Sequence, residues 1–262
     1  MQEVLQYFLF LSVGVLAGFV NTLAGGASVF ILSTLLFFGV PANVANGTNR
    51  LGIFVQNLAG TTTFYKNGLL DIPSSLIYVI PSIIGASFGA WIATDISQQL
   101  LEYIMAGVMA ITLYPLLKKP PKVSLQEIIH KQKNPVVIAL LFFSIGFYGG
   151  FIQAGIGLLI IVALSKIVHL SIIRSNAIKM LIILIYTLPV FIIFVYNDLV
   201  DWPIAIWLAI GQIIGTSIAA KFFVKHPKAN IWVKWLLVSM ILIAIIKIIE
   251  WKFLWDLMVT YV

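Results

Sequence analysis

Ten polar side chains lie within or beside the long apolar stretches of this sequence, and every one of them is neutral or basic. Amides, hydroxyls and basic groups all donate hydrogen bonds, and an anion needs such donors to replace its water shell. The candidate binding residues fall into one group in each half of the chain: Asn21, Thr22, Asn46, Thr48, Asn49 and Arg50, then Gln153, Ser175, Asn176 and Lys179.

The spacing within each group places pairs of these side chains together. Asn46 and Asn49 are three residues apart, as are Asn176 and Lys179, so each pair shares one face of a helix. Both pairs occupy the opening turns of predicted long helices, where free backbone N–H groups and the helix dipole favour negative charge. We expect the two helix starts to converge on one anion site between the halves.

A structural interpretation of the same residues stays open. An Asn or Thr in a membrane helix often bonds only to a neighbouring helix. Arg50 and Lys179 have the alternative of extending to a membrane interface.

Acidic residues are absent from the middle of every apolar stretch. They stand at or near segment ends or in the linker: Glu3, Asp71, Asp95, Glu102, Glu127, Asp198, Asp201, Glu250 and Asp256. Carriers of protons or sodium often keep a carboxylate at membrane depth, so the pattern favours an anionic ligand. The chain has no cysteine, and its three histidines are scattered. We therefore predict no metal, no cofactor and no enzymatic activity.

The composition requires lipid as the solvent. Hydrophobic residues make up 61% of the 262 residues and charged residues 10%, and the mean hydropathy is +1.07. Soluble domains carry about 25% charged residues. The net charge of +7 comes mostly from basic residues in connecting segments, which the positive-inside rule explains without a nucleic-acid partner. We predict an all-α polytopic membrane protein.

Hydropathy predicts two sets of five segments separated by a Lys-rich linker at 118–134. The ranges are 4–24, 27–39, 43–65, 74–94 and 98–117, then 135–153, 157–169, 174–196, 203–222 and 230–250. The segments 27–39 and 157–169 are short, and each follows a glycine-broken turn. Irregular backbone at membrane depth survives only inside protein or beside water, so these breaks indicate a functional region. Whether the short segments span the membrane or re-enter it stays open.

The two halves repeat one another. At an offset of 132, Gly14 and Gly18 match Gly146 and Gly150, and Asn21 matches Gln153. The offset then becomes 130 and aligns the following pairs: Asn46 with Asn176, Asn67 with Asn197, Asp71 with Asp201, and Gly85 with Gly215. The expected domains are a first repeat at 1–117, a cytoplasmic linker at 118–134 and a second repeat at 135–262.

Five segments per repeat predict that the halves are inverted. With the linker in the cytoplasm, most basic residues lie at cytoplasmic ends, and only Arg50, Lys247 and Lys252 lie towards the outside. Inverted repeats with broken helices are typical of secondary transporters, whose site lies between the halves.

The order of these motifs resembles the TauE/SafE (sulfite exporter) family. The first repeat carries the likeness with Gly14-Val-Leu-Ala-Gly18, Asn21-Thr22-Leu-Ala-Gly25-Gly26 and Ala45-Asn46-Gly47-Thr48-Asn49. Gly146 to Gly157 and Asn176 to Lys179 resemble a degenerate second copy. The resemblance implies a multi-pass transporter of the bacterial inner membrane that exports small sulfur-containing anions, such as sulfite or the organosulfonate sulfoacetate.

The leading hypothesis is therefore an alternating-access exporter of a sulfonate or sulfite. The alternatives are an importer, a carrier of another small oxyanion or carboxylate, and a membrane enzyme or assembly subunit without transport activity. The anion, the direction, the coupling ion and the oligomeric state stay open.

Overall fold

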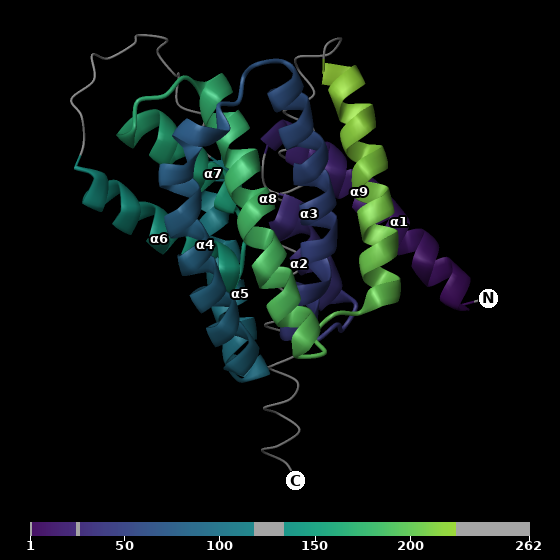
Figure 1. Cartoon of the computed structure of the whole chain (residues 1–262). Helices are drawn as coiled ribbons and strands as arrows, with labels where there is room; N and C mark the ends of the chain where they lie inside the picture. Colours follow the sequence, from purple (N-terminus) through teal and green to yellow (C-terminus); the bar gives the residue numbers. More distant parts are fainter. Residues whose placement is uncertain (1, 25–26, 118–133, 224–262) are drawn as a thin grey trace.

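The computed structural model describes residues 2–24, 27–117 and 134–223, and the regular secondary structure of these residues is entirely helical. The predicted segment 230–250 and nearly all of the predicted linker lie outside the described residues. The elements are α1 (Gln2–Ala24), α2 (Ala27–Phe37), α3 (Ala42–Lys66), α4 (Ile72–Asp95), α5 (Gln98–Leu117), α6 (Pro135–Phe151), α7 (Ile156–Val162), the π-helix η1 (Ala163–Ile167), α8 (Ile172–Tyr196) and α9 (Trp202–Phe223) (Figure 1). The predicted all-α class is confirmed.

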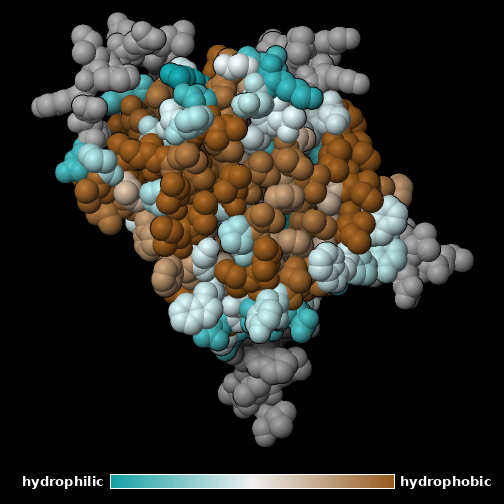
Figure 2. Space-filling model, in the orientation of Figure 1, coloured by the Kyte–Doolittle hydropathy of each residue, from teal (hydrophilic) through white to brown (hydrophobic). Residues whose placement is uncertain are grey.

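An apolar band crosses the middle of the face shown in Figure 2, with polar side chains at both ends. Exposed Ile, Leu, Phe and Trp side chains on α4, α6, α8 and α9 contribute to the apolar surface. Among the described residues, α4 and α8 are long and apolar enough to cross a bilayer, and shorter apolar stretches occupy parts of α1, α2, α6, α7–η1 and α9. This surface is that of a helical membrane protein.

The most polar helix, α3, lies inside the bundle. It buries Asn46, Thr48, Asn49, Arg50 and Gln56, among other residues, and it packs against α8 and α9. A helix with this many polar side chains cannot face lipid, because each unpaired polar group in hydrocarbon costs free energy. The apolar helices around α3 therefore separate its polar groups from the bilayer.

Helices of one half pack against helices of the other half. α1 packs along α9, which follows α8 in the second half, and α4 packs along α6, which begins that half. Glycines allow the close approach: a Cβ added at Gly18 would clash with the Gln212 backbone, and one at Gly150 would clash with the Ala86 backbone. Each contact therefore joins the first helix of one half to the fourth helix of the other.

The turns that follow α3 and α8 match residue by residue at the predicted offset of 130. Asn67 and Asn197 cap their helices with nearly equal φ angles of −88° and −95°. Each also donates a 2.8 Å side-chain bond to the carbonyl four residues earlier. The two turns lie at opposite ends of the bundle (Figure 1), as an inverted repeat requires.

The predicted alignment of α1 with α6, its counterpart in the second repeat, is wrong by one helical turn. Gly85 packs against the Phe143 carbonyl, whereas its counterpart Gly215 packs against the Val15 carbonyl, which gives an offset of 128 rather than 132. Gly18 therefore corresponds to Gly146, and Asn21 to Gly149. The sequence misleads because glycines spaced four residues apart still align after a slip of four residues.

Both predicted short segments are short helices. α2 has 11 residues, and α7 has 7 residues before the helix widens into η1. At about 1.5 Å per residue, α2 extends roughly 16 Å, about half of a 30 Å hydrocarbon core. Neither α2 nor α7 spans such a core by itself as an α-helix.

Candidate functional site

The predicted glycine break after α6 is present, and a non-glycine residue shares its strain. Gln153 has φ 66° and Gly155 has φ 69°, both in the left-handed region that favours glycine. The hydroxyl of Tyr148 donates to the Ala154 carbonyl and secures the turn. The chain reverses here inside the protein, because Gln153, Ala154 and Gly155 are all buried.

Arg50 on α3 binds the end of α6 at this break. Its Nη1 donates to the Gly149 carbonyl at 2.7 Å, and its Nη2 donates to the Gly150 carbonyl at 2.7 Å. The last carbonyls of a helix lack intrahelical partners and carry the negative end of the dipole. The Arg50 guanidinium therefore caps α6 from the other half of the chain.

Asn46 completes this cap one turn earlier on α3. Its Nδ2 donates to the Phe151 carbonyl at 2.6 Å, and its Oδ1 accepts from Arg50 Nη2 at 2.8 Å. The guanidinium also lies over the Phe194 ring, 5.3 Å from its centroid. Arg50 is fully buried, so it neither extends to an interface nor belongs in the charge count for the outer side.

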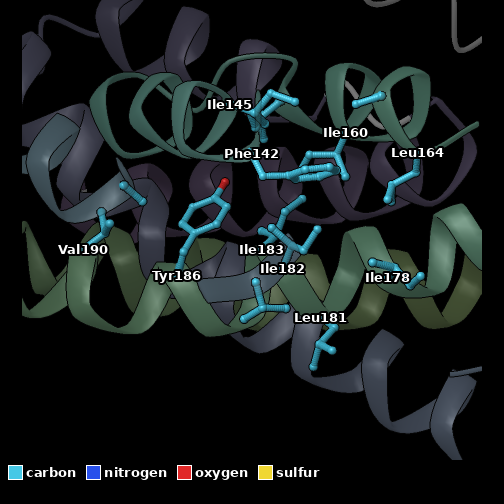
Figure 3. Close-up of a cluster of buried hydrophobic side chains, with 14 of the residues drawn as sticks. Phe142, Ile145, Ile160, Leu164, Ile178, Leu181, Ile182, Ile183, Tyr186 and Val190 are labelled. Carbon is cyan, nitrogen blue, oxygen red and sulfur yellow. The ribbon is translucent and has the colours of Figure 1, made fainter. Parts of the chain in front are cut away.

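Gln153 meets Tyr186 beside this cap. The Gln153 Nε2 donates to the Tyr186 hydroxyl at 3.4 Å, and the Gln153 Oε1 has no partner in the part of the chain that the structure describes. Tyr186 lies within an otherwise apolar cluster on α8, and its oxygen points away from that helix (Figure 3). That hydroxyl is the nearest neighbour of a Cβ built on Gly149.

An equivalent contact at the end of α1 uses different residues. Asn21 Nδ2 donates to Gln56 Oε1 at 2.7 Å, and Gln56 Nε2 donates to Thr216 Oγ1 at 2.8 Å. Gln56 and Tyr186 are counterparts at the offset of 130, and Asn21 and Gly149 are counterparts at 128. The contacts at the ends of α1 and α6 thus use corresponding positions, but the side chains at those positions differ in polarity.

Two buried amides have no partner at all. Neither amide atom of Asn49 on α3 and neither amide atom of Gln212 on α9 makes a hydrogen bond among the described residues. The Gln212 amide occupies the space that a Cβ on Gly52 would fill. Asn49 lies one turn before Gly52, which places its side chain on the face of α3 that Gln212 packs against. We call Asn49 and Gln212 the amide pair.

The other predicted residues have separate positions. The Thr48 Oγ1 accepts from the Asp201 backbone N–H at 3.0 Å, and Ser175 donates to the Leu170 carbonyl at 3.5 Å. Both bonds serve the fold. Asn176 is half-buried, and Lys179 is 6% exposed; neither has an ion-pair or hydrogen-bond partner in the described residues. Thr22 lies on α1, and its side chain is outside the described residues.

The two predicted groups do not converge on one point. α3 and α8 are antiparallel, because Arg50 meets Phe194 while Gly60 meets Met180. Asn176 then lies level with position 64, about 18 residues from Asn46, or roughly 27 Å along the axis. By the same reasoning Lys179 lies roughly 16 Å from Arg50. The expectation that both helix starts meet is wrong, since inversion places them at opposite ends.

Sequence reasoning missed three residues in the middle of the bundle: Gln56, Tyr186 and Gln212. A signal existed for Gln56, which follows Asn49 by seven residues and so shares its helix face. Tyr186 occupies the same position in the second repeat, within a stretch that looks wholly apolar. Gln212 interrupts an apolar run of α9, and nothing in its spacing indicates a site.

The sulfite exporter TauE/SafE family model matches residues 10–248. The chain is 26% identical over 218 residues to the "Probable membrane transporter protein ORF9" of Sinorhizobium sp, covering 82% of each chain. It is likewise 26% identical over 221 residues to the "Probable membrane transporter protein YdhB" of Bacillus subtilis, covering 82% of this chain and 88% of that one. A "Probable membrane transporter protein" of Xylella fastidiosa is 25% identical over 251 residues, covering 91% and 93%. No solved structure matches the chain.

Proposed function

The chain belongs to the sulfite exporter TauE/SafE family, and on that premise we propose that it is a secondary transporter of a small sulfur-containing anion, such as sulfite or an organosulfonate. One observation supports the anion most directly. The buried polar side chains of the described residues include two cations, Arg50 and Lys179, and no carboxylate.

A buried charge without a counterion is costly, because the low-dielectric interior replaces its water shell poorly. Arg50 is compensated by the partial charges of carbonyls and one amide and by the Phe194 ring, and Lys179 by no partner among the described residues. The interior is therefore positive. An anion that enters the interior acts as the counterion that these two side chains lack among the described residues, whereas a cation is repelled.

Seven of the ten residues predicted from the sequence are proposed to bind the anion, and six of them are divided between two levels of the α3–α8 pair. Arg50, Asn46 and Asn49 are near one level, Lys179, Ser175 and Asn176 near the other, and Gln153 belongs to the α6 break. A sulfonate spreads its charge over three oxygens, so it requires several moderate donors around it. Such donors hold the anion without trapping it, and a carrier must release its ligand.

The proposed transport cycle is alternating access between inverted repeats. The close glycine contacts make α1 with α9, and α4 with α6, the natural rigid units. Their movement relative to α3 and α8 would expose the two levels in turn. Family membership supports export across a bacterial inner membrane by a multi-pass protein; import, or transport of another small oxyanion or carboxylate, is the alternative.

The test is a thermal-shift screen of purified protein against sulfite, sulfoacetate, thiosulfate, acetate and taurine. A ligand that binds only the folded state stabilises it by about 2.7 kcal/mol at a concentration of 100 Kd. We expect the sulfur anions to raise Tm and acetate to raise it less. The reverse order would favour a carboxylate carrier. No response to any anion, combined with stabilisation by an amine, would refute the proposal.

A further inference from the structure

The amide pair, Asn49 and Gln212, is a place where the fold leaves four buried polar atoms unsatisfied. Asn49 is 1% exposed and Gln212 is fully buried. An unpaired buried donor or acceptor costs about 1–3 kcal/mol, so native proteins rarely tolerate several together. Among the described residues, Asn49 and Gln212 are the buried side-chain amides in which neither the oxygen nor the nitrogen has a partner, and such groups indicate a missing partner.

The internal repeat provides a control for this observation. At the offset of 130, Asn49, Gly52 and Gln212 correspond to Lys179, Ile182 and Ser82. Ser82 is satisfied, because its hydroxyl donates to the Tyr78 carbonyl at 2.8 Å and lies 3.2 Å from the Phe142 carbonyl. Ile182 adds an apolar side chain where Gly52 has none. The fold therefore does not require an open amide pair at this position, and the first repeat carries it for another reason.

The chemistry of the pair defines its ligand. Each primary amide offers an acceptor oxygen and two N–H donors. A bare sulfonate or carboxylate only accepts hydrogen bonds and would leave both amide oxygens unpaired. A hydroxyl both donates and accepts, and it brings no charge into a region that holds no counterion for a cation.

We propose that Asn49 and Gln212 bind an uncharged hydroxyl-type group of the transported compound and so select hydroxylated over unsubstituted sulfonates. The inference rests on the proposed function, because it assumes that a sulfonate is carried. Asn49 immediately precedes Arg50, so the amide pair and the guanidinium flank the same turn of α3. One end of the compound is then recognised by charge and the other by hydrogen bonds alone.

A matched pair of probes tests this: 2-hydroxyethanesulfonate and ethanesulfonate, which differ by one hydroxyl. Affinities would be measured by calorimetry on the purified full chain and on Asn49→Leu and Gln212→Met. Because two hydrogen bonds from neutral groups are at stake, we expect the parent to prefer the hydroxylated probe roughly ten- to a hundredfold. Gln212→Met should lose most of that preference and bind ethanesulfonate like the parent, and Asn49→Leu should also lose most of the preference.

Asn57→Leu is the control, since Asn57 is a buried amide on the same helix whose Nδ2 already donates to the Ile53 carbonyl at 2.8 Å. It should keep the preference. Equal affinities for both probes in the parent, or an unchanged preference in Asn49→Leu and Gln212→Met, would overturn the inference while leaving a sulfonate transporter intact. An equal loss in Asn57→Leu would assign the effect to repacking and overturn it as well. Binding of neither probe, nor of any other sulfur anion, would instead refute the proposed function.

Discussion

Removing the charge of one buried cation should lower the stability of the protein, whereas removing the charge of the other should not. Arg50 donates three hydrogen bonds, two of them to the carbonyls of Gly149 and Gly150 in the other half of the chain. Hydrogen bonds to charged groups contribute about 1.5–3 kcal/mol each. Arg50→Met loses both inter-half bonds and leaves two carbonyls unpaired, so we expect it to destabilise the protein by about 3–6 kcal/mol.

Arg50→Lys separates charge from geometry. Lysine keeps the positive charge but has one nitrogen in place of a planar fork, so it cannot reproduce the two-carbonyl cap. We expect it to lose about one inter-half bond, roughly 1.5–3 kcal/mol. Lys179→Met is the matched comparison, because Lys179 is a buried cation without a partner in the described residues. Removing its charge relieves desolvation, so its stability should be unchanged or higher.

The assay is thermal unfolding of the purified variants in one detergent, with a size-exclusion profile for each. At roughly 2–4 °C per kcal/mol, Arg50→Met should unfold at least 6 °C below the parent. The Tm should be lowest for Arg50→Met, higher for Arg50→Lys, and highest for Lys179→Met and the parent. Equal Tm values for Arg50→Met and Lys179→Met would refute the assignment of Arg50 as the cap of α6.

Three further expectations concern packing, topology and the ligand. Gly150→Ala should destabilise by about 1–3 kcal/mol through its clash with the Ala86 carbonyl, whereas Gly107→Ala, with open space around it, should be neutral or stabilising in the same unfolding assay. In this cysteine-free chain, Asn67→Cys should react with an impermeant reagent only from the cytoplasmic side and Asn197→Cys only from outside; labelling of both from one side would contradict inversion. Lys179→Met should weaken anion binding roughly ten- to a hundredfold by calorimetry, and replacing sodium with choline should leave the parent's affinity unchanged.

The sequence was sufficient for the elements whose signals are local. Runs of apolar residues placed α3, α4, α8 and α9 within two residues of their observed ends. The repeat followed from Asn67, Asp71 and their counterparts, because turns and caps restrict residue type. The correct alignment of α1 with its counterpart α6 could not be predicted, because glycines spaced by one helical turn still match after a shift of one turn.

The site was only partly predictable, since it depends on which helices meet. Composition singled out Arg50 and Asn46 but not that they cap the end of α6, a contact across about 100 residues. The predicted convergence of Asn46 and Asn176 is wrong for a related reason: α3 and α8 run antiparallel, so their starts lie at opposite ends of the bundle. Gln212 became recognisable only through its packing on Gly52.

The packing of helices between the halves also determines the order in which the protein can mature on the ribosome. α1 is synthesised first, but its glycine-lined partner surface on α9 begins about 200 residues later, a delay of roughly 10–40 s at 5–20 residues per second. α6, in contrast, emerges when α4 is already complete. The nascent first half must therefore wait in the bilayer before Gly14 and Gly18 can pack against α9, and a chain released before α9 would present that surface to other membrane helices.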